Sequence, residues 1–134
     1  MKAVVYDRYG PPEVLELRER EKPAVTEGGL LVRVRAVSLN AMDWYFLTGT
    51  PYPARLAAGL LRPKRDVPGV DFAGTVEAVG TGVKRFRPGD EVFGGARGTL
   101  AEYVCAREDR VALKPANVTF EQAAAVPVAG LTAL

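Results

Sequence analysis

One stretch of alternating residues, residues 68–94, constrains the fold of this chain more than any other. Apolar side chains occupy every second position through residues 70–78, which places them on one face of a strand, while Asp71 and Glu77 fall on the other face. At residues 88–90, proline fixes φ and glycine supplies the positive φ that a type II turn needs. The stretch therefore predicts two consecutive strands joined by a turn.

Shorter patterns of the same kind predict a mainly β domain around this stretch. Alternating or β-branched runs, delimited by glycine and proline, predict strands at residues 3–6, 15–19, 30–39, 99–106 and 111–113. The first two should form an opening hairpin, the third should be a long barrel strand, and the last should lie at an edge.

Two short helices are expected after the long strand. Asn40 is suited to cap a helix that runs to Leu47, and Asp43 lies in its first turn, where a negative charge complements the helix dipole. Leucines at helical spacing predict a short amphipathic helix or lid at residues 54–61, followed by the basic residues 62–65.

Near its C-terminal end the chain carries another helix signal. Thr119 and Gln122 have the spacing of a capping box, so a helix should run over residues 120–125, with Pro127 interrupting or restarting it. The last residues, 128–134, form an apolar pattern without a polar cap. We therefore expect residues 1–134 to be one domain that is cut at the entry to a further domain.

Composition and charge exclude several classes of protein. The formal net charge of +2, with basic and acidic residues interspersed, argues against a nucleic-acid surface. Charges appear too early for a signal-peptide core and no apolar run approaches the ~18 residues of a membrane span, so we expect a cytoplasmic protein. With one cysteine and no histidine, the chain has no internal disulfide and no set of side chains for the usual zinc sites.

The order of glycines resembles that of a known superfamily. The pattern P-G-x-D-x-x-G-x-V at residues 68–76, G-x-G-V at 80–83 and P-G-D-x-V at 88–92 resembles the medium-chain dehydrogenase/reductase superfamily. The resemblance covers essentially the whole chain and implies a GroES-like β-barrel, mainly β with short helices, that lacks the C-terminal Rossmann domain. Zinc-dependent members carry a histidine where this chain has Val70, so the resemblance implies a barrel without that metal.

Residues 40–45, N-A-M-D-W-Y, are similar to the zinc-free quinone and enoyl reductases, which transfer hydride from NADPH to a conjugated carbonyl. Zinc-dependent members have a cysteine at the position of Asn40, and an amide cannot replace a thiolate as a ligand. Hydride addition to an enone generates an enolate, which needs a hydrogen-bond donor and a proton but no Lewis acid. Tyr45 is the candidate donor, because a tyrosine hydroxyl is protonated at neutral pH. The alternative is a barrel-edge aromatic with a solvated hydroxyl.

The resemblance implies further binding residues, each with a structural alternative. Asn40 could contact the cofactor ribose or the nicotinamide amide, or it could cap the helix, and one residue could do both. Asp43 could contact the cofactor, although a first-turn acid is favoured without any ligand. Thr132, in the G-L-T-A segment, matches a position near the nicotinamide. Trp44 and Tyr52 could line a substrate pocket or pack in the core.

Two other charged features have simpler interpretations. Asp71 replaces the glutamate that the superfamily places near the metal, and we expect it to hydrogen-bond to backbone within the barrel. The basic residues 62–65 could face a 2′-phosphate, although a solvated turn is the commoner explanation.

The sequence therefore predicts the N-terminal domain of a zinc-independent NAD(P)H-dependent oxidoreductase, inactive as a 134-residue chain and a homo-oligomer when complete. Its expected substrates are quinones, enones or aldehydes, with NADPH or NADH bound mainly by a further domain and with no metal. The alternative is a free-standing GroES-like β-barrel that binds or assembles without catalysis. A glycine-rich strand–turn–helix beyond Leu134 would distinguish the two.

Overall fold

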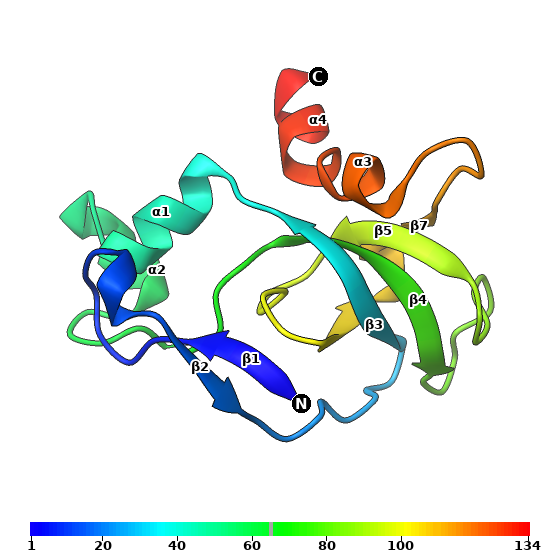
Figure 1. The fold of residues 1–134 in the computed structure, drawn as a ribbon, viewed down its shortest axis with the longest axis horizontal. Helices are drawn as coiled ribbons and strands as arrows, with labels where there is room; N and C mark the ends of the chain where they lie inside the picture. Colours follow the sequence, from blue (N-terminus) through cyan, green and yellow to red (C-terminus); the bar gives the residue numbers. More distant parts are fainter. Residues whose placement is uncertain (65) are drawn as a thin grey trace.

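The computed structural model describes residues 1–64 and 66–134 and confirms a mainly β domain with short helices (Figure 1). Arg65, part of the predicted basic turn, lies outside the described residues. The strands are β1 (Lys2–Val5), β2 (Glu16–Glu19), β3 (Gly29–Ser38), β4 (Asp71–Val79), β5 (Glu91–Gly95), β6 (Tyr103–Arg107) and β7 (Val111–Leu113). The α-helices are α1 (Ala41–Thr48), α2 (Arg55–Ala58), α3 (Phe120–Ala124) and α4 (Pro127–Ala133). Short 3₁₀ turns are η1 (Pro12–Val14), η2 (Tyr52–Ala54) and η3 (Glu108–Arg110).

Five antiparallel strands form the main sheet in the order β6-β3-β4-β5-β7, which places β7 at an edge as predicted. The long strand β3 pairs with β4 along nearly its full length, from Leu30 opposite Val79 to Ser38 opposite Asp71. The register shifts twice along this pair, which is typical of the β-bulges that bend a strand in a barrel. The main core packs against this curved sheet and comprises Leu30, Val32, Phe72, Val76, Phe86, Val92, Val104, Ala106 and Val111.

The opening hairpin β1–β2 closes over the main sheet through residues that are distant in sequence. The amide of Val4 donates to the carbonyl of Leu100 at 2.9 Å, and the amide of Glu102 donates to the carbonyl of Lys2 at 3.0 Å. An isolated bridge pairs Ala3 with Ala101 in the same stretch. The hairpin therefore joins the segment that leads into β6.

Strand β4 corrects the prediction that its second face is polar. Asp71 and Ala73, which the alternating pattern assigns to that face, are both completely buried. Two alanines of helix α3 pack against Ala73, and the backbone amide of Val128 in α4 contacts Asp71. The first half of β4 is thus buried on both sides, and only its second half exposes Glu77.

The helix predicted at residues 54–61 is also wrong in extent. Only Arg55–Ala58 is α-helical, and Gly59 follows with a φ of 122°. Leu60 and Leu61 lie beyond that break and are exposed, so leucine spacing alone does not define a buried face here. The strand predicted at residues 99–106 is likewise shorter at its start, because β6 begins at Tyr103.

The helix ends follow the capping signals in the sequence. Helix α1 starts after Asn40 and ends at Gly49, which has the left-handed φ of 64°. Helix α3 starts after Thr119, whose hydroxyl accepts from the amide of Gln122 at 3.1 Å. Pro127 restarts the chain as α4. Among the described residues, no helix is both long and apolar enough to cross a membrane.

Gly74 provides a test of the β3–β4 approach. A Cβ at this position would lie 2.2 Å from the carbonyl oxygen of Arg33 on β3, so Gly74→Ala forces the backbones apart. We expect the free energy of unfolding to fall by about 1–3 kcal/mol. The matched control is Gly95→Ala on β5, where the nearest atom to a new Cβ is 3.9 Å away. Urea titration of both variants measures the difference, and equal stabilities would contradict the close approach.

Candidate functional site

The buried carboxylate of Asp71 joins three parts of the chain. Its Oδ2 accepts a hydrogen bond at 3.0 Å from the Ser38 hydroxyl, at the end of β3, and one at 3.0 Å from the Asn40 amide nitrogen. The backbone amide of Val128, in the first turn of α4, donates to both carboxylate oxygens at 3.2 and 3.3 Å. Asp71 is 0% exposed, so these donors replace water.

The position of Asp71 also suits its charge. The amide groups in the first turn of a helix lack intrahelical partners and carry a partial positive charge, which favours a nearby anion. The carboxylate lies at that end of α4, so Asp71 hydrogen-bonds to backbone as expected, but that backbone belongs to α4 and not to the barrel. Asp71 therefore fixes where α4 begins relative to α1.

Asp43 lies in the first turn of α1, close to this cluster. Its Oδ2 accepts from the backbone amide of Asn40 at 2.7 Å, which is the return contact of the capping box. Burial raises the pKa of the Asp43 carboxyl above its usual value, and the charge of Asp71 raises the pKa further, while the hydrogen bonds from Asn40 oppose the shift. Its other oxygen, Oδ1, is buried without a hydrogen-bond partner among the described residues.

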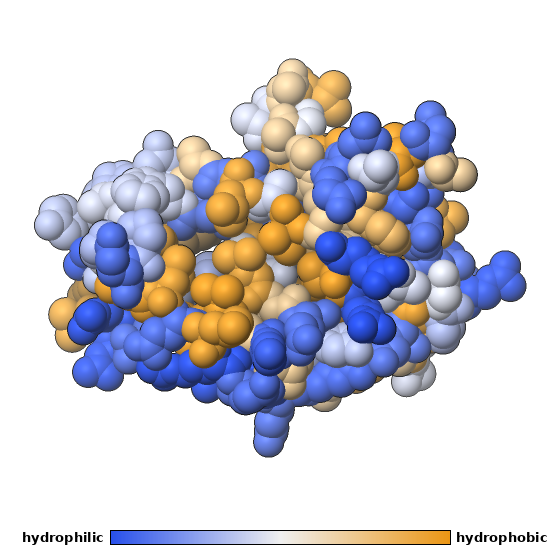
Figure 2. Space-filling model, in the orientation of Figure 1, coloured by the Kyte–Doolittle hydropathy of each residue, from blue (hydrophilic) through white to orange (hydrophobic). Residues whose placement is uncertain are grey.

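The aromatic candidates lie at the surface. Trp44 is 52% exposed and Tyr45 is 49% exposed on α1, and Tyr52 is 71% exposed in η2, so none of them packs in the core. Figure 2 shows the outline of the surface notched between the lobe that carries α1 and the projecting helix α4. The exposed rings are therefore available to a ligand or to another part of a larger protein.

The structure brings some of the predicted residues together and leaves others apart. Asn40 and Asp43 are in direct contact, and Asn40 is linked through Asp71 to α4, which carries Thr132 one turn after Val128. Thr132 itself is exposed. No hydrogen bond within the described part of the chain connects the side chain of Tyr45 with that of Asn40.

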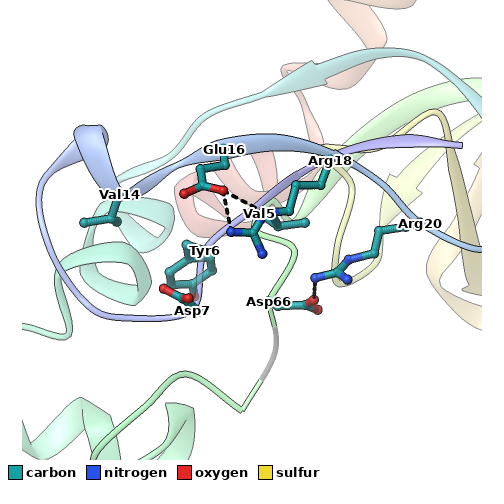
Figure 3. Close-up of a pocket in the computed structure, with 8 residues that line it drawn as sticks. All are labelled: Val5, Tyr6, Asp7, Val14, Glu16, Arg18, Arg20 and Asp66. Atoms are coloured by element: carbon teal, nitrogen blue, oxygen red, sulfur yellow. Dashed lines mark hydrogen bonds and ion pairs between the residues drawn. The ribbon is translucent and has the colours of Figure 1, made fainter.

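Two hollows lie elsewhere, beside the β1–β2 hairpin. The smaller, of about 110 Å³, is lined by Val5, Tyr6, Asp7, Val14, Glu16, Arg18, Arg20 and Asp66 (Figure 3). Two ion pairs, Glu16 with Arg18 and Asp66 with Arg20, cross its lining. The larger is an open depression around Met1 and Pro23. Neither hollow includes a predicted site residue.

Sequence reasoning missed two residues of this region. Ser38 donates to Asp71, but nothing in the sequence reveals the strand register that brings the two together. Arg55 stacks against Tyr52, with its guanidinium carbon 4.8 Å from the ring centre. The pairing of an arginine with a tyrosine three residues earlier could have indicated that contact.

Comparison with known proteins agrees with the fold and the motifs. Residues 26–116 match the model of the alcohol dehydrogenase GroES-like domain. The chain is 37% identical to the 2-methylene-furan-3-one reductase of Solanum lycopersicum, over 99% of this chain and 36% of that protein.

Two solved structures are also similar. The quinone oxidoreductase of Coxiella burnetii superposes with a TM-score of 0.87 at 37% identity, over 99% of this chain and 43% of that chain. The quinone oxidoreductase of Escherichia coli complexed with NADPH gives a TM-score of 0.83 at 30% identity, over 98% of this chain and 39% of that chain. The chain thus spans about two-fifths of the length of these relatives.

Replacing Asp71 by alanine tests its role as the common acceptor. The change leaves the Ser38 hydroxyl, the Asn40 amide and the Val128 N–H without their partner, so we expect the free energy of unfolding to fall by about 2–4 kcal/mol. Asp7→Ala removes an exposed carboxylate and should alter stability by about 0.5 kcal/mol or less. Chemical denaturation of both variants makes the comparison. A stable Asp71→Ala protein would refute the role.

Asp43 predicts a dependence of stability on pH. The pKa of Asp43 in the folded protein is raised above its value in the unfolded chain, so at a pH between these two values the folded protein binds more protons than the unfolded chain. The stability of the folded protein therefore rises as the pH falls through the folded-state pKa. Asp43→Asn keeps an oxygen to accept from Asn40 but cannot titrate. Wild type should therefore gain stability relative to Asp43→Asn between neutral and mildly acidic pH, as measured by urea unfolding. A difference that does not change with pH would contradict the raised pKa.

Proposed function

Because the chain belongs to the alcohol dehydrogenase GroES-like domain family of medium-chain dehydrogenases/reductases, quinone reductase type, we propose that it is the N-terminal domain of a zinc-independent oxidoreductase. The complete enzyme would use NAD(P)H to reduce quinones or other conjugated carbonyls. The 134-residue chain would be catalytically inactive by itself, because the cofactor would be held mainly by a following Rossmann domain.

The observation that carries the proposal is the contact between Asn40 and Asp71. At the position where zinc-dependent relatives have a cysteine ligand, Asn40 donates a hydrogen bond to a buried carboxylate. The carboxylate is in turn occupied by Ser38 and Val128. Among the described residues, no three histidine, cysteine, aspartate or glutamate side chains gather as a metal site. These contacts support a site in which neutral hydrogen-bond donors interact with the substrate oxygen.

The residues around α1 and α4 fit a nicotinamide cofactor in their chemistry. The half-buried amide of Asn40 and the exposed hydroxyl of Thr132 can pair with ribose hydroxyls or a carboxamide. Asp43 Oδ1 is a buried acceptor that lacks a partner among the described residues. A bound NAD(P)H would supply the hydride. NADPH is the form we favour, because the similar E. coli structure holds it.

In this proposal Tyr45 stabilises the negative oxygen of the substrate. Its side chain is half exposed on α1, so its hydroxyl can contact the carbonyl oxygen of a substrate that binds beside the helix. A donated hydrogen bond strengthens as charge develops on that oxygen, which lowers the barrier more than it favours binding. Trp44 and Tyr52, both exposed, would contact the flat substrate. The proposal also keeps a cytoplasmic location and a homo-oligomeric complete protein.

Tyr45→Phe in the protein encoded by the complete reading frame tests this assignment. Loss of the hydroxyl should lower kcat for quinone reduction by about 100-fold and leave the Kd for NADPH within about twofold. Steady-state NADPH oxidation and a fluorescence titration of NADPH measure the two quantities.

The control is Tyr103→Phe, which removes a phenolic hydroxyl from β6 and should leave kcat and the Kd for NADPH unchanged. The 134-residue chain should show no turnover in the same assay. Unchanged kinetics in Tyr45→Phe would rule out the donor role, and quinone reduction by the 134-residue chain would rule out the need for a second domain.

A further inference from the structure

A guanidinium group lies between two tyrosine rings beside α1. The guanidinium carbon of Arg55 is 4.6 Å from the centre of the Tyr9 ring and 4.8 Å from the centre of the Tyr52 ring. The Tyr9 hydroxyl donates to the carbonyl of Gly59 at 2.5 Å, which holds that ring against the chain after α2. We call this arrangement of Tyr9, Arg55 and Tyr52 the arginine clasp.

The arginine clasp is bonded to the end of α1. Arg55 Nε donates to the carbonyl oxygen of Gly49 at 2.9 Å, and the amide of Gly49 donates to the carbonyl oxygen of Tyr45, also at 2.9 Å. The contacts therefore run from the backbone of Tyr45 through Gly49 and Arg55 to the ring of Tyr52. The candidate hydrogen-bond donor, Tyr45, and the candidate substrate-contacting ring share one support.

Gly49 is the residue that admits this support. Its φ of 64° favours glycine, and a Cβ there would lie 2.7 Å from Arg55 Nε and 2.7 Å from Cγ of Tyr9. Only a residue without a side chain lets the guanidinium and the Tyr9 ring approach the helix end so closely.

An arginine suits this place better than a lysine. Its flat, delocalised cation can stack on an aromatic ring on each face while an N–H in its plane donates to a carbonyl, whereas an ammonium presents no flat face. Tyr52 is 71% exposed, so it has little other packing to hold it. The orientation of its ring therefore depends on Arg55.

We propose that Arg55 is a positioning residue that fixes the ring of Tyr52 relative to α1 and thereby sets the affinity of the enzyme for its acceptor substrate. This inference rests on the function proposed above. Arg55 acts through Tyr52 and takes no part in hydride or proton transfer, so its loss should raise the KM for the quinone and leave kcat and the KM for NADPH unchanged.

The first test measures the clasp without catalysis. A double-mutant cycle on the 134-residue chain combines Arg55→Lys with Tyr52→Leu and follows the unfolding equilibrium in urea. A stacked guanidinium and an exposed ring correspond to a coupling of about two- to fivefold in the equilibrium constant. The control cycle pairs Arg55→Lys with Tyr103→Leu and should show no coupling. A Tyr52 cycle without coupling would overturn the proposal.

The second test is kinetic and uses the complete protein. Arg55→Lys keeps the charge and loses the flat face, so we expect the KM for a benzoquinone to rise about two- to fivefold, with kcat and the KM for NADPH unchanged within error. Arg85→Ala, which removes an exposed arginine that stacks on Phe86, is the matched control and should change nothing.

The two tests separate the possible failures. A fall in kcat at a constant KM for the quinone would indicate a merely structural residue and would overturn the proposal. An Arg55→Lys protein whose KM for the quinone equals that of wild type would also overturn it. If the wild-type protein reduces no quinone, the proposed function fails, while the double-mutant cycle still decides whether Arg55 positions Tyr52.

Discussion

A buried negative charge determines how this domain is assembled. Removing a carboxylate from water costs several kcal/mol unless hydrogen bonds replace the lost hydration. Asp71 meets that requirement with donors from the end of β3, from the residue before α1 and from the first turn of α4. No single element could supply all three. The need to satisfy one side chain thus brings together the elements that form the candidate site.

The two halves of the site are held by different forces. On the α4 side, buried hydrogen bonds to a charge fix the backbone and leave little freedom. On the α1 and η2 side, the exposed Tyr52 stacks on Arg55, and Arg55 donates one hydrogen bond to the carbonyl of Gly49 at the end of α1. Such surface contacts are weaker than buried ones. Under the proposed function, the α4 side would therefore hold the cofactor more firmly than the α1 and η2 side holds the substrate-contacting ring.

Local sequence rules predicted the parts of the fold that local interactions determine. Most strand positions, the start of α1 after Asn40 and the capping box of Thr119 depend on a few neighbouring residues, and the structure confirms them. The burial of Asp71 depends in part on α4, whose Val128 lies 57 residues later in the chain and outside any pattern around residue 71. The helix predicted at residues 54–61 failed for a different, local reason, because it ends before Gly59, which has a positive φ. The metal-ligand replacements at Val70 and Asn40 came from family resemblance, and the catalytic role of Tyr45 is still a prediction.

The pairing of Val4 with Leu100 has a consequence for biosynthesis. The ribosome synthesises the first strand some hundred residues before residues 100–102, which pair with it. The barrel therefore cannot close while most of the domain is being made. Until then the edge of β1 that will receive residues 100–102 is unpaired and can bind another nascent chain. Chaperone capture or slow translation over that interval would therefore influence the yield of this domain.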